Sequence, residues 1–242
     1  MLEDLRYLLL QSRNLDDPMR TQEVACFARA LETTTARIGV FDLISTALSE
    51  RDLENVDVVL LGGSGHYSVT ENEPWLDRAL DSLRVVYDSR KPTFASCWGF
   101  QALAKALGGR VIKDLERAEI GTQDVFLTEA GLADPVFGTL GPKFRGQMGH
   151  EDHVVELPRG ATRLAYSEKV ANQAYRFDDR PIYCTQFHPE LNCADLQGRI
   201  ETYPEYIERI AGLPVAAFRD MIEETPETEA LLKRFVQMVV DG

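Results

Sequence analysis

Cys97 is the residue of this 242-residue chain whose surroundings best suit a nucleophile. It stands in Phe94–Gln101 (FASCWGFQ), directly after a short apolar run and directly before a segment that predicts a helix. A strand that turns tightly into a helix holds such a side chain out over the edge of a sheet, and Gly99 eases the turn. The positive end of the helix dipole favours the thiolate. Cysteine is also common in protein cores, so Cys97 alone permits a purely structural role.

A possible base and its partner occur in Gln186–Glu190 (QFHPE), at the end of the apolar run IYCTQF. Side chains two residues apart in an extended chain face the same side, so Glu190 can contact the imidazole of His188 and fix its tautomer. The other ring nitrogen then faces the thiol. Nucleophile, base and orienting acid form the general arrangement of covalent catalysis. A lone His-Pro-Glu is equally compatible with a simple turn.

A third motif is the glycine loop Leu60–Gly65 (LLGGSG), which ends an apolar run. Glycine allows the backbone to point its N–H groups at a ligand without steric conflict. Amide cleavage builds negative charge on the carbonyl oxygen, which two N–H donors can stabilise in an oxyanion hole. We expect Gly63 and Trp98 to supply these donors. The loop lacks the pattern of a dinucleotide-binding or P-loop motif, and many glycine clusters are plain turns.

Taken together, the three motifs resemble the class I (triad-type) glutamine amidotransferase family. The resemblance rests on Gly62-Gly63, on Cys97–Gln101 and on His188–Glu190, in this order and spacing, and it covers roughly residues 40–192. The chain departs from the family pattern at Ala95, where glycine is usual, and at Ser64, where proline is usual. Alanine is small enough for the tight turn.

The resemblance implies a mechanism in which Cys97, His188 and Glu190 form a catalytic triad. The thiolate attacks the side-chain amide of glutamine, ammonia leaves, and water releases glutamate from a γ-glutamyl thioester. The residues implied to bind the substrate are Gly62, Gln101, Gly149 and His150. The last two lie in Met148–Asp152 (MGHED), which looks like the family's M-S-H-G-D segment but differs from it at two positions. No metal and no other cofactor is implied.

Strands and helices alternate in the first half of the chain, which predicts an α/β domain with a parallel sheet and a ligand site at the carboxyl ends of its strands. The expected strands are Leu5–Leu10, Arg37–Leu43, Val56–Leu61 and Thr93–Ser96, and the expected helices are Met19–Thr33, Pro74–Asp88 and Trp98–Leu107. The resemblance implies a three-layer, flavodoxin-like fold with a central, mostly parallel sheet.

Strand patterns predominate from Arg110 onward, and helical patterns fill the last 50 residues. The expected strands are Ile120–Leu127, Gly149–Leu157, Arg163–Ser167, Gln173–Phe177 and Ile182–Phe187, and the expected helices are Tyr203–Ile210, Ala216–Glu224 and Glu227–Val240. No repeat and no Pro/Gly/Ser-rich linker interrupts the sequence. We therefore expect one domain over residues 1–242, with a helical C-terminal extension from about residue 194.

Composition narrows the possible partners and compartment. The net charge is −13, with 39 acidic against 26 basic residues, which argues against a nucleic-acid-binding surface. The four cysteines form no CxxC pair, which favours reduced thiols in a cytoplasm. No run approaches the roughly 20 apolar residues that cross a bilayer, so we expect no membrane association.

Three functions remain open at this stage. The first is a glutamine amidotransferase that releases ammonia; because the sequence holds no synthetase domain, its acceptor would be a separate synthetase subunit. The second is a stand-alone γ-glutamyl hydrolase or peptidase acting on a γ-glutamyl compound. The third is a non-catalytic binding protein on the same scaffold, which the intact triad pattern disfavours.

Overall fold

The computed structural model describes residues 4–212, 214–219 and 222–241. In this part of the chain nine strands form one sheet in the order β2-β1-β3-β4-β11-β10-β9-β6-β7, and β5 pairs with β8 in a small second sheet. The strands are β1 (Tyr7–Gln11), β2 (Ile38–Asp42), β3 (Val58–Leu61), β4 (Thr93–Ser96), β5 (Arg110–Lys113), β6 (Glu119–Leu127), β7 (Lys143–His150), β8 (Asp152–Glu156), β9 (Ala161–Tyr166), β10 (Ala174–Phe177) and β11 (Ile182–Thr185).

The large sheet is mostly parallel, as expected. Strands β2, β1, β3, β4 and β11 pair in parallel, and only β10 and β6 among its described strands run in the opposite direction. The predicted α/β class is therefore confirmed. The parallel half ends its strands at a common edge, and β4 and β11 are neighbours there, with Ser96 opposite Thr185.

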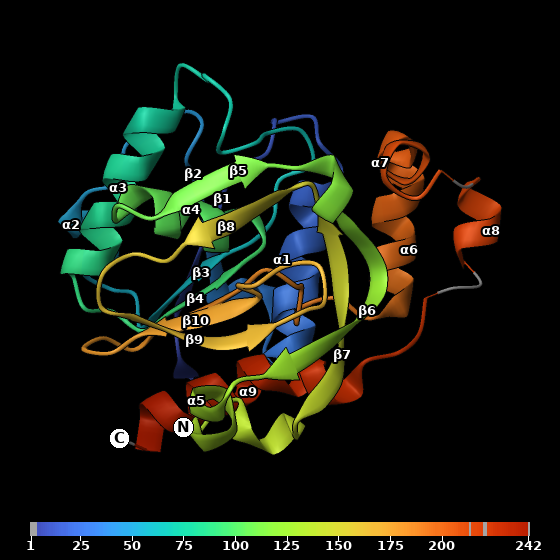
Figure 1. Ribbon diagram of the computed structural model, residues 1–242. Helices are drawn as coiled ribbons and strands as arrows, with labels where there is room; N and C mark the ends of the chain where they lie inside the picture. The colour runs from blue at the N-terminus through green and yellow to red at the C-terminus, as the bar shows by residue number, and fades with distance from the viewer. Residues whose placement is uncertain (1–3, 213, 220–221, 242) are drawn as a thin grey trace.

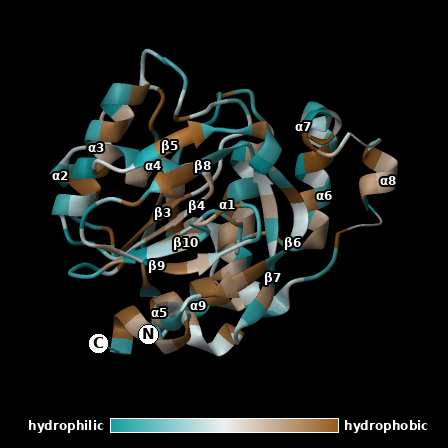
Figure 2. Ribbon diagram, in the orientation of Figure 1, coloured by the Kyte–Doolittle hydropathy of each residue, from teal (hydrophilic) through white to brown (hydrophobic). Residues whose placement is uncertain are grey.

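Helices cover both faces of the sheet, which gives three layers (Figure 1). They are α1 (Met19–Ala30), α2 (Glu50–Leu53), α3 (Leu76–Asp88), α4 (Trp98–Ala106), α5 (Glu129–Ala133), α6 (Cys193–Thr202), α7 (Pro204–Ile210), α8 (Val215–Arg219) and α9 (Pro226–Asp241). In β3, Val58 and Leu60 pack with residues of α1 and α9, whereas Val59 and Leu61 pack with α3 and α4. This alternation explains the continuous apolar run of the strand, and Figure 2 shows hydrophobic residues gathered in the central strands.

Most predicted elements agree with the structure. The expected helix Ala216–Glu224 is too long, because α8 ends at Arg219 and residues 222–224 are not helical; residues 220 and 221 lie outside the described residues. Strand β5 has no counterpart among the expected strands. The expected strand Gly149–Leu157 is wrong: β7 ends at His150, and a reversal precedes β8. Strand β7 was missed because its sequence, KFRGQMGH, lacks a hydrophobic alternation, although its polar Gln147 is fully buried. Helix α6 lies within the helical extension expected from about residue 194, but its own bounds were not among the expected helices; Asn192 and Asp195 form a capping box at its start.

The C-terminal helices pack in two different places. Leu231, Leu232 and Phe235 of α9 lie in the core beside α1. Helices α6, α7 and α8 instead form a cluster against Cys26 and Ile120, on the side of the molecule opposite α2 and α3 (Figure 1). That cluster lies beside the carboxyl ends of the central strands. No helix in the described ranges combines the length and hydropathy that crossing a bilayer requires.

Candidate active site

Cys97 occupies a strained turn between β4 and α4. Its φ of 51° and ψ of −105° are unfavourable for a residue with a side chain. Two hydrogen bonds hold the turn: the Cys97 N–H donates to the Thr185 carbonyl at 2.8 Å, and the Gln101 N–H donates to the Cys97 carbonyl at 3.1 Å. At Gly99 a Cβ atom would lie 2.5 Å from the Cβ of Leu61, so only glycine fits. The structure therefore contains the tight turn that the sequence predicts.

His188 follows β11, the strand next to β4, and faces Cys97 across the sheet edge. The backbone N–H of His188 donates to the Gln147 carbonyl at 2.9 Å. Nδ1 of the imidazole lies 2.7 Å from Oε1 of Glu190, whose side chain is fully buried. Cys97 and the same imidazole line one cavity and interact electrostatically. The structure thus brings together the three side chains predicted to form a triad.

The charges of this group stabilise a protonated imidazole. Burial alone would lower the pKa of His188, but the charges of Glu190 and Cys97, together with hydrogen bonds to both, raise it to about 9. Burial would raise the pKa of Glu190, and the nearby charges of His188 and Arg199 outweigh that effect and lower it. His188 therefore carries a proton at neutral pH, as a donor to a leaving group must.

Because His188 is protonated in the folded protein, we expect the stability of the fold to depend on pH. Between its ordinary pKa of 6.5 and the folded value of about 9, the folded protein keeps a proton that the unfolded chain loses. This contribution is complete below pH 6.5 and disappears as the pH rises through about 9. We expect the free energy of unfolding, measured by chemical denaturation, to decline across this window. The His188→Asn variant should lack that part of the decline, and an identical decline in the variant would contradict the assignment.

The two expected oxyanion donors lie on either side of Cys97. Trp98 is the first residue of α4, and Gly63 follows β3 in a loop that is fixed to α4 by a hydrogen bond from the Gly99 N–H to the Gly62 carbonyl, 3.1 Å long. Within the described ranges, neither the Gly63 nor the Trp98 N–H donates to a protein acceptor. Both groups are therefore available to an oxygen that develops negative charge.

Gly63 also sets the position of His188, and this predicts a mutant phenotype. A Cβ at residue 63 would lie 2.9 Å from Cε1 of the imidazole. The Gly63→Ala variant should therefore displace the ring and lower kcat by about 10²-fold, since displacements near 1 Å have effects of that order. Steady-state kinetics would measure the loss. Gly39→Ala in β2 is the matched control, because its Cβ would meet the nearest atom at an ordinary 3.5 Å.

The predicted substrate-binding residues separate into two groups. Gln101, Gly149 and His150 line a cavity above Cys97, and the Gly149 carbonyl lies 3.8 Å from the sulfur. Gly62 lines neither cavity of the site, and its role in substrate binding stays a prediction. A Cβ there would lie 2.1 Å from Oε1 of the buried Glu23, so this glycine permits close packing behind the loop.

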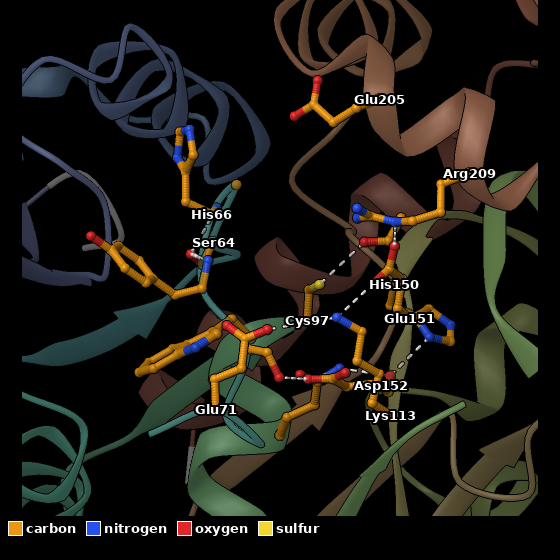
Figure 3. Close-up of a pocket in the computed structure, with 16 residues that line it drawn as sticks. Ser64, His66, Glu71, Cys97, Lys113, His150, Glu151, Asp152, Glu205 and Arg209 are labelled. Carbon is orange, nitrogen blue, oxygen red and sulfur yellow. Dashed lines mark hydrogen bonds and ion pairs between the residues drawn. The ribbon is translucent and has the colours of Figure 1, made fainter. Parts of the chain in front are cut away.

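The cavity above Cys97, here called the polar cavity, has a volume of ≈ 210 Å³. Its lining residues are Ser64, Gly65, His66, Tyr67, Ser68, Glu71, Cys97, Trp98, Gln101, Lys113, Gly149, His150, Glu151, Asp152, Glu205 and Arg209. Figure 3 shows Lys113 between Glu71 and Glu151, with Arg209 on the other side of Glu151. Charges of both signs thus surround the sulfur.

Asp152 lies at the base of the polar cavity. It is 5% exposed, its Oδ2 accepts from the Ser68 hydroxyl, and its Oδ1 has no hydrogen-bond partner among the described residues. Burial raises the pKa of this carboxyl. His150 is held differently, with Nδ1 3.0 Å from the Asp152 carbonyl and Nε2 3.2 Å from Oε2 of Glu119. Both ring nitrogens of His150 are therefore already engaged.

A second cavity of ≈ 60 Å³, here called the apolar cavity, opens on the His188 side of Cys97. Its lining residues are Arg13, Gly63, Ser64, Gly65, Cys97, Ile120, Met148, Gly149, His188, Leu191, Leu196, Arg199, Ile200 and Tyr203. His188 borders this cavity and does not border the polar one. The sulfur therefore lies between two compartments of different polarity.

Sequence reasoning missed a buried charge network behind His188 and Glu190. Nη1 of Arg199 lies 3.7 Å from Oε1 of Glu190, and Nη2 lies 4.0 Å from Oε1 of Glu23. Arg13, which is 2% exposed, pairs with Glu23 and Asp17 at 3.2 Å each. Pairing is what makes buried charges tolerable. The capping box of α6 signals a helix start, but no local pattern reveals that its arginine faces the triad.

No cluster of three or more His, Cys, Asp or Glu side chains that would hold a metal ion occurs within the described ranges. His150 and His153, whose spacing suggests a metal pair, are both buried. His150 is fully engaged by Asp152 and Glu119, as described above.

Comparisons with known proteins agree with this geometry. The model of the family described as glutamine amidotransferase class-I matches residues 22–200. Gamma-glutamyl peptidase 4 of Arabidopsis thaliana is 31% identical over 145 residues, 59% of this chain and 57% of the peptidase. The glutamine-hydrolyzing GMP synthase of Vibrio atlanticus is 34% identical over 158 residues, 64% of this chain and 28% of the synthase. The matches thus span little more than half of the peptidase and a smaller share of the synthase.

Solved structures share the fold. A glutamine amidotransferase from Thermotoga maritima superposes with a TM-score of 0.77 at 24% identity, over 98% of this chain and 99% of that one. The common part therefore includes the C-terminal helices that follow the family match. At this level of identity the likeness establishes the arrangement of the elements.

Proposed function

Because the chain belongs to the class I glutamine amidotransferase family, we propose that it hydrolyses the γ-carboxamide of glutamine through a γ-glutamyl thioester on Cys97. The observation that carries the proposal is the placement of Cys97 on a strained turn opposite an imidazole whose other nitrogen is 2.7 Å from a buried carboxylate. A nucleophile, a proton donor and an orienting acid in contact are the components of covalent amide hydrolysis.

In the first half of the reaction the Cys97 thiolate attacks the γ-carbonyl carbon and a C–S bond forms. The carbonyl oxygen takes up negative charge and accepts hydrogen bonds from the Gly63 and Trp98 N–H groups. As the tetrahedral intermediate collapses, the C–N bond breaks and His188 gives its proton to the departing nitrogen. Ammonia and the γ-glutamyl thioester are the products of this half.

In the second half water attacks the thioester carbon while the now neutral His188 accepts a proton from it. The C–S bond breaks, glutamate leaves, and the thiolate and the protonated imidazole are restored. Glu190 keeps Nδ1 of the imidazole protonated throughout, so the other nitrogen exchanges the proton. The raised pKa of His188, to about 9, supports its role as the proton donor of the first half.

The polar cavity suits the amino-acid end of the substrate. Glutamine carries an α-ammonium and an α-carboxylate, and the cavity offers carboxylates at Glu71, Asp152 and Glu205 and cations at Lys113 and Arg209. Because Oδ1 of Asp152 is buried without a hydrogen-bond partner among the described residues, an ammonium there would satisfy it. The substrate thus extends from this cavity to the sulfur.

The proposal is tested by incubating the purified protein with glutamine and measuring glutamate and ammonia in equal amounts. Intact-mass analysis of a rapidly quenched reaction should show the γ-glutamyl adduct on Cys97. Absence of both hydrolysis and adduct, with and without a cell extract that supplies partner subunits, would refute it. Stimulation by the extract would point to a separate synthetase that accepts the ammonia.

A second candidate function is favoured by the apolar cavity. The cavity beside His188 has a volume of ≈ 60 Å³, which is more than a departing ammonia molecule needs, since about 10–15 Å³ holds one water-sized molecule. An enzyme that cleaves N-substituted γ-glutamyl amides by the same chemistry would use that space. The relative named as a γ-glutamyl peptidase agrees with such a use.

A further inference from the structure

We propose that the apolar cavity binds the leaving group, and that its substrates are γ-glutamyl amides of small primary amines with an apolar carbon chain. This inference rests on the proposed thioester chemistry, because that chemistry determines where the leaving group lies. The reaction is the hydrolysis of γ-glutamyl-NH-R to glutamate and the amine RNH₂. The C–N bond breaks, His188 protonates the nitrogen, and a water molecule supplies the hydroxyl of glutamate.

The position of His188 assigns the cavity to the leaving group. The nitrogen that departs must lie within reach of the imidazole, since that ring delivers its proton. His188 borders the apolar cavity and does not border the polar cavity. With the amino-acid end of the substrate in the polar cavity and the carbonyl carbon at Cys97, a substituent on the nitrogen extends into the apolar cavity.

The walls of the cavity select an apolar substituent. They are formed by five apolar side chains from β6, β7, α6 and the turn before α6: Ile120, Met148, Leu191, Leu196 and Ile200. All five are at least nine-tenths buried. Burial of a hydrocarbon chain against them is favourable by about fourfold in affinity for each methylene group.

The charged groups at the rim are already paired with other charged groups of the protein. Arg13 donates to Glu23, to Asp17 and to the hydroxyl of Tyr203, and that hydroxyl donates to Asp17 at 2.7 Å. The Arg199 Nε donates to Gln22 at 3.1 Å, and its Nη1 and Nη2 lie 3.7 Å and 4.0 Å from carboxylate oxygens of Glu190 and Glu23, although Nη2 makes no hydrogen bond among the described residues. An ammonium substituent would lose its hydration beside two guanidinium groups, and a carboxylate would lose its hydration among apolar walls and compete with Glu190 and Glu23 for Arg199, which is unfavourable in both cases.

The volume of the cavity limits the length of the chain. One water-sized group needs about 10–15 Å³ by this measure, so ≈ 60 Å³ holds about four to six such groups. A butyl chain fits these limits, whereas an octyl chain exceeds them. Ammonia would leave most of the space unfilled.

Helix α6 determines the size of this cavity. It contributes Leu196, Arg199 and Ile200, and Tyr203 at its end packs so closely over the glycine loop that a Cβ at Gly65 would lie 2.2 Å from the ring. The C-terminal extension thus forms one wall of the reactive site. Substrate preference is therefore expected to respond to substitutions in α6.

The test compares hydrolysis of glutamine with that of its N-ethyl, N-butyl, N-octyl and N-(3-carboxypropyl) amides by the wild-type protein. We expect kcat/KM for the butyl amide to exceed that for glutamine by at least about tenfold, with a decrease for the octyl amide and for the carboxylate. If the protein hydrolyses glutamine but none of the alkyl amides, or if it prefers the N-(3-carboxypropyl) amide to the butyl amide, the inference is overturned and the proposed function stays intact. Failure of every substrate, with and without the cell extract, would refute both.

Two variants of Ile200 provide an independent measurement, because they should change the substrate preference in opposite directions. Ile200→Phe fills the cavity and should lower the ratio of kcat/KM for the butyl amide to that for glutamine by at least about tenfold. Ile200→Ala enlarges the cavity and should move the preference towards the octyl amide. Ile210→Phe in α7 is the matched control, since residue 210 is partly buried in the same helix cluster but outside the cavity. Equal ratios in all variants would contradict the assignment.

Discussion

The Cys97→Ala variant is expected to hydrolyse glutamine at least about 10³-fold more slowly than the wild-type protein, because the attacking atom is absent. Cys97→Ser should be almost as inactive, since a hydroxyl is far less acidic than a thiol and the site positions the imidazole for sulfur. Among the described residues that line the two cavities, Cys97 is the only cysteine. No neighbouring thiol in these linings can replace it.

The comparison with Cys193 makes this prediction specific. Cys193 is more exposed than Cys97, which is 6% exposed, and it lies outside both cavities. Cys193→Ala should therefore retain full activity. A small general alkylating reagent should also modify Cys193, whereas an electrophilic glutamine analogue should label Cys97 alone and glutamine should protect it. Full activity of Cys97→Ala, or labelling that glutamine does not prevent, would be incompatible with the proposed mechanism.

The Glu190→Gln variant is expected to lower kcat by about 10²–10⁴-fold, a range typical of removing the charge that orients a catalytic histidine. The substitution keeps the shape of a side chain that is fully buried and 2.7 Å from Nδ1 of His188. It removes the negative charge of Glu190, which raises the pKa of His188 against the lowering effect of burial. The pKa of His188 should therefore fall, and the proton donor should be lost at lower pH.

The pH profile distinguishes this electrostatic role from simple destabilisation. In the wild-type protein, kcat should decrease as the pH rises through about 9, where His188 loses its proton. In Glu190→Gln the decrease should begin at lower pH, whereas Glu201→Gln, an exposed change on α6, should leave the profile in place. A variant with reduced kcat but an unshifted profile would argue against this role of Glu190.

Local sequence patterns were sufficient to predict the elements that carry the chemistry. A buried strand that alternates its side chains between two helical layers must be apolar throughout, so Val58–Leu61 is visible from sequence alone. A strand-to-helix turn with small residues has few alternatives, and β4 was predicted with its observed bounds. The two-residue spacing of His188 and Glu190 placed both side chains on one side of the chain. These features depend on contacts between residues close in sequence.

Other features depend on contacts between distant residues, and only the tertiary structure decided them. Strand β7 is recognisable through its partner β6, because its own residues do not alternate. The role of Gly62 depends on Glu23, a residue of α1 that lies against it. Similarly, Arg199 approaches Glu190 only because α6 packs against α1.

The two compartments around Cys97 have the same origin. Their walls combine residues from the glycine loop, from β6 and β7 and from helices α6 and α7, so no single segment encodes their polarity or size. The sequence by itself predicted the sulfur, the imidazole and the carboxylate of the proposed triad, because each lies in a short motif, and the pairing of β4 with β11 brings these motifs together. The packing of the C-terminal helices determined what surrounds them, because burial and charge pairing arise only when segments far apart in the chain meet.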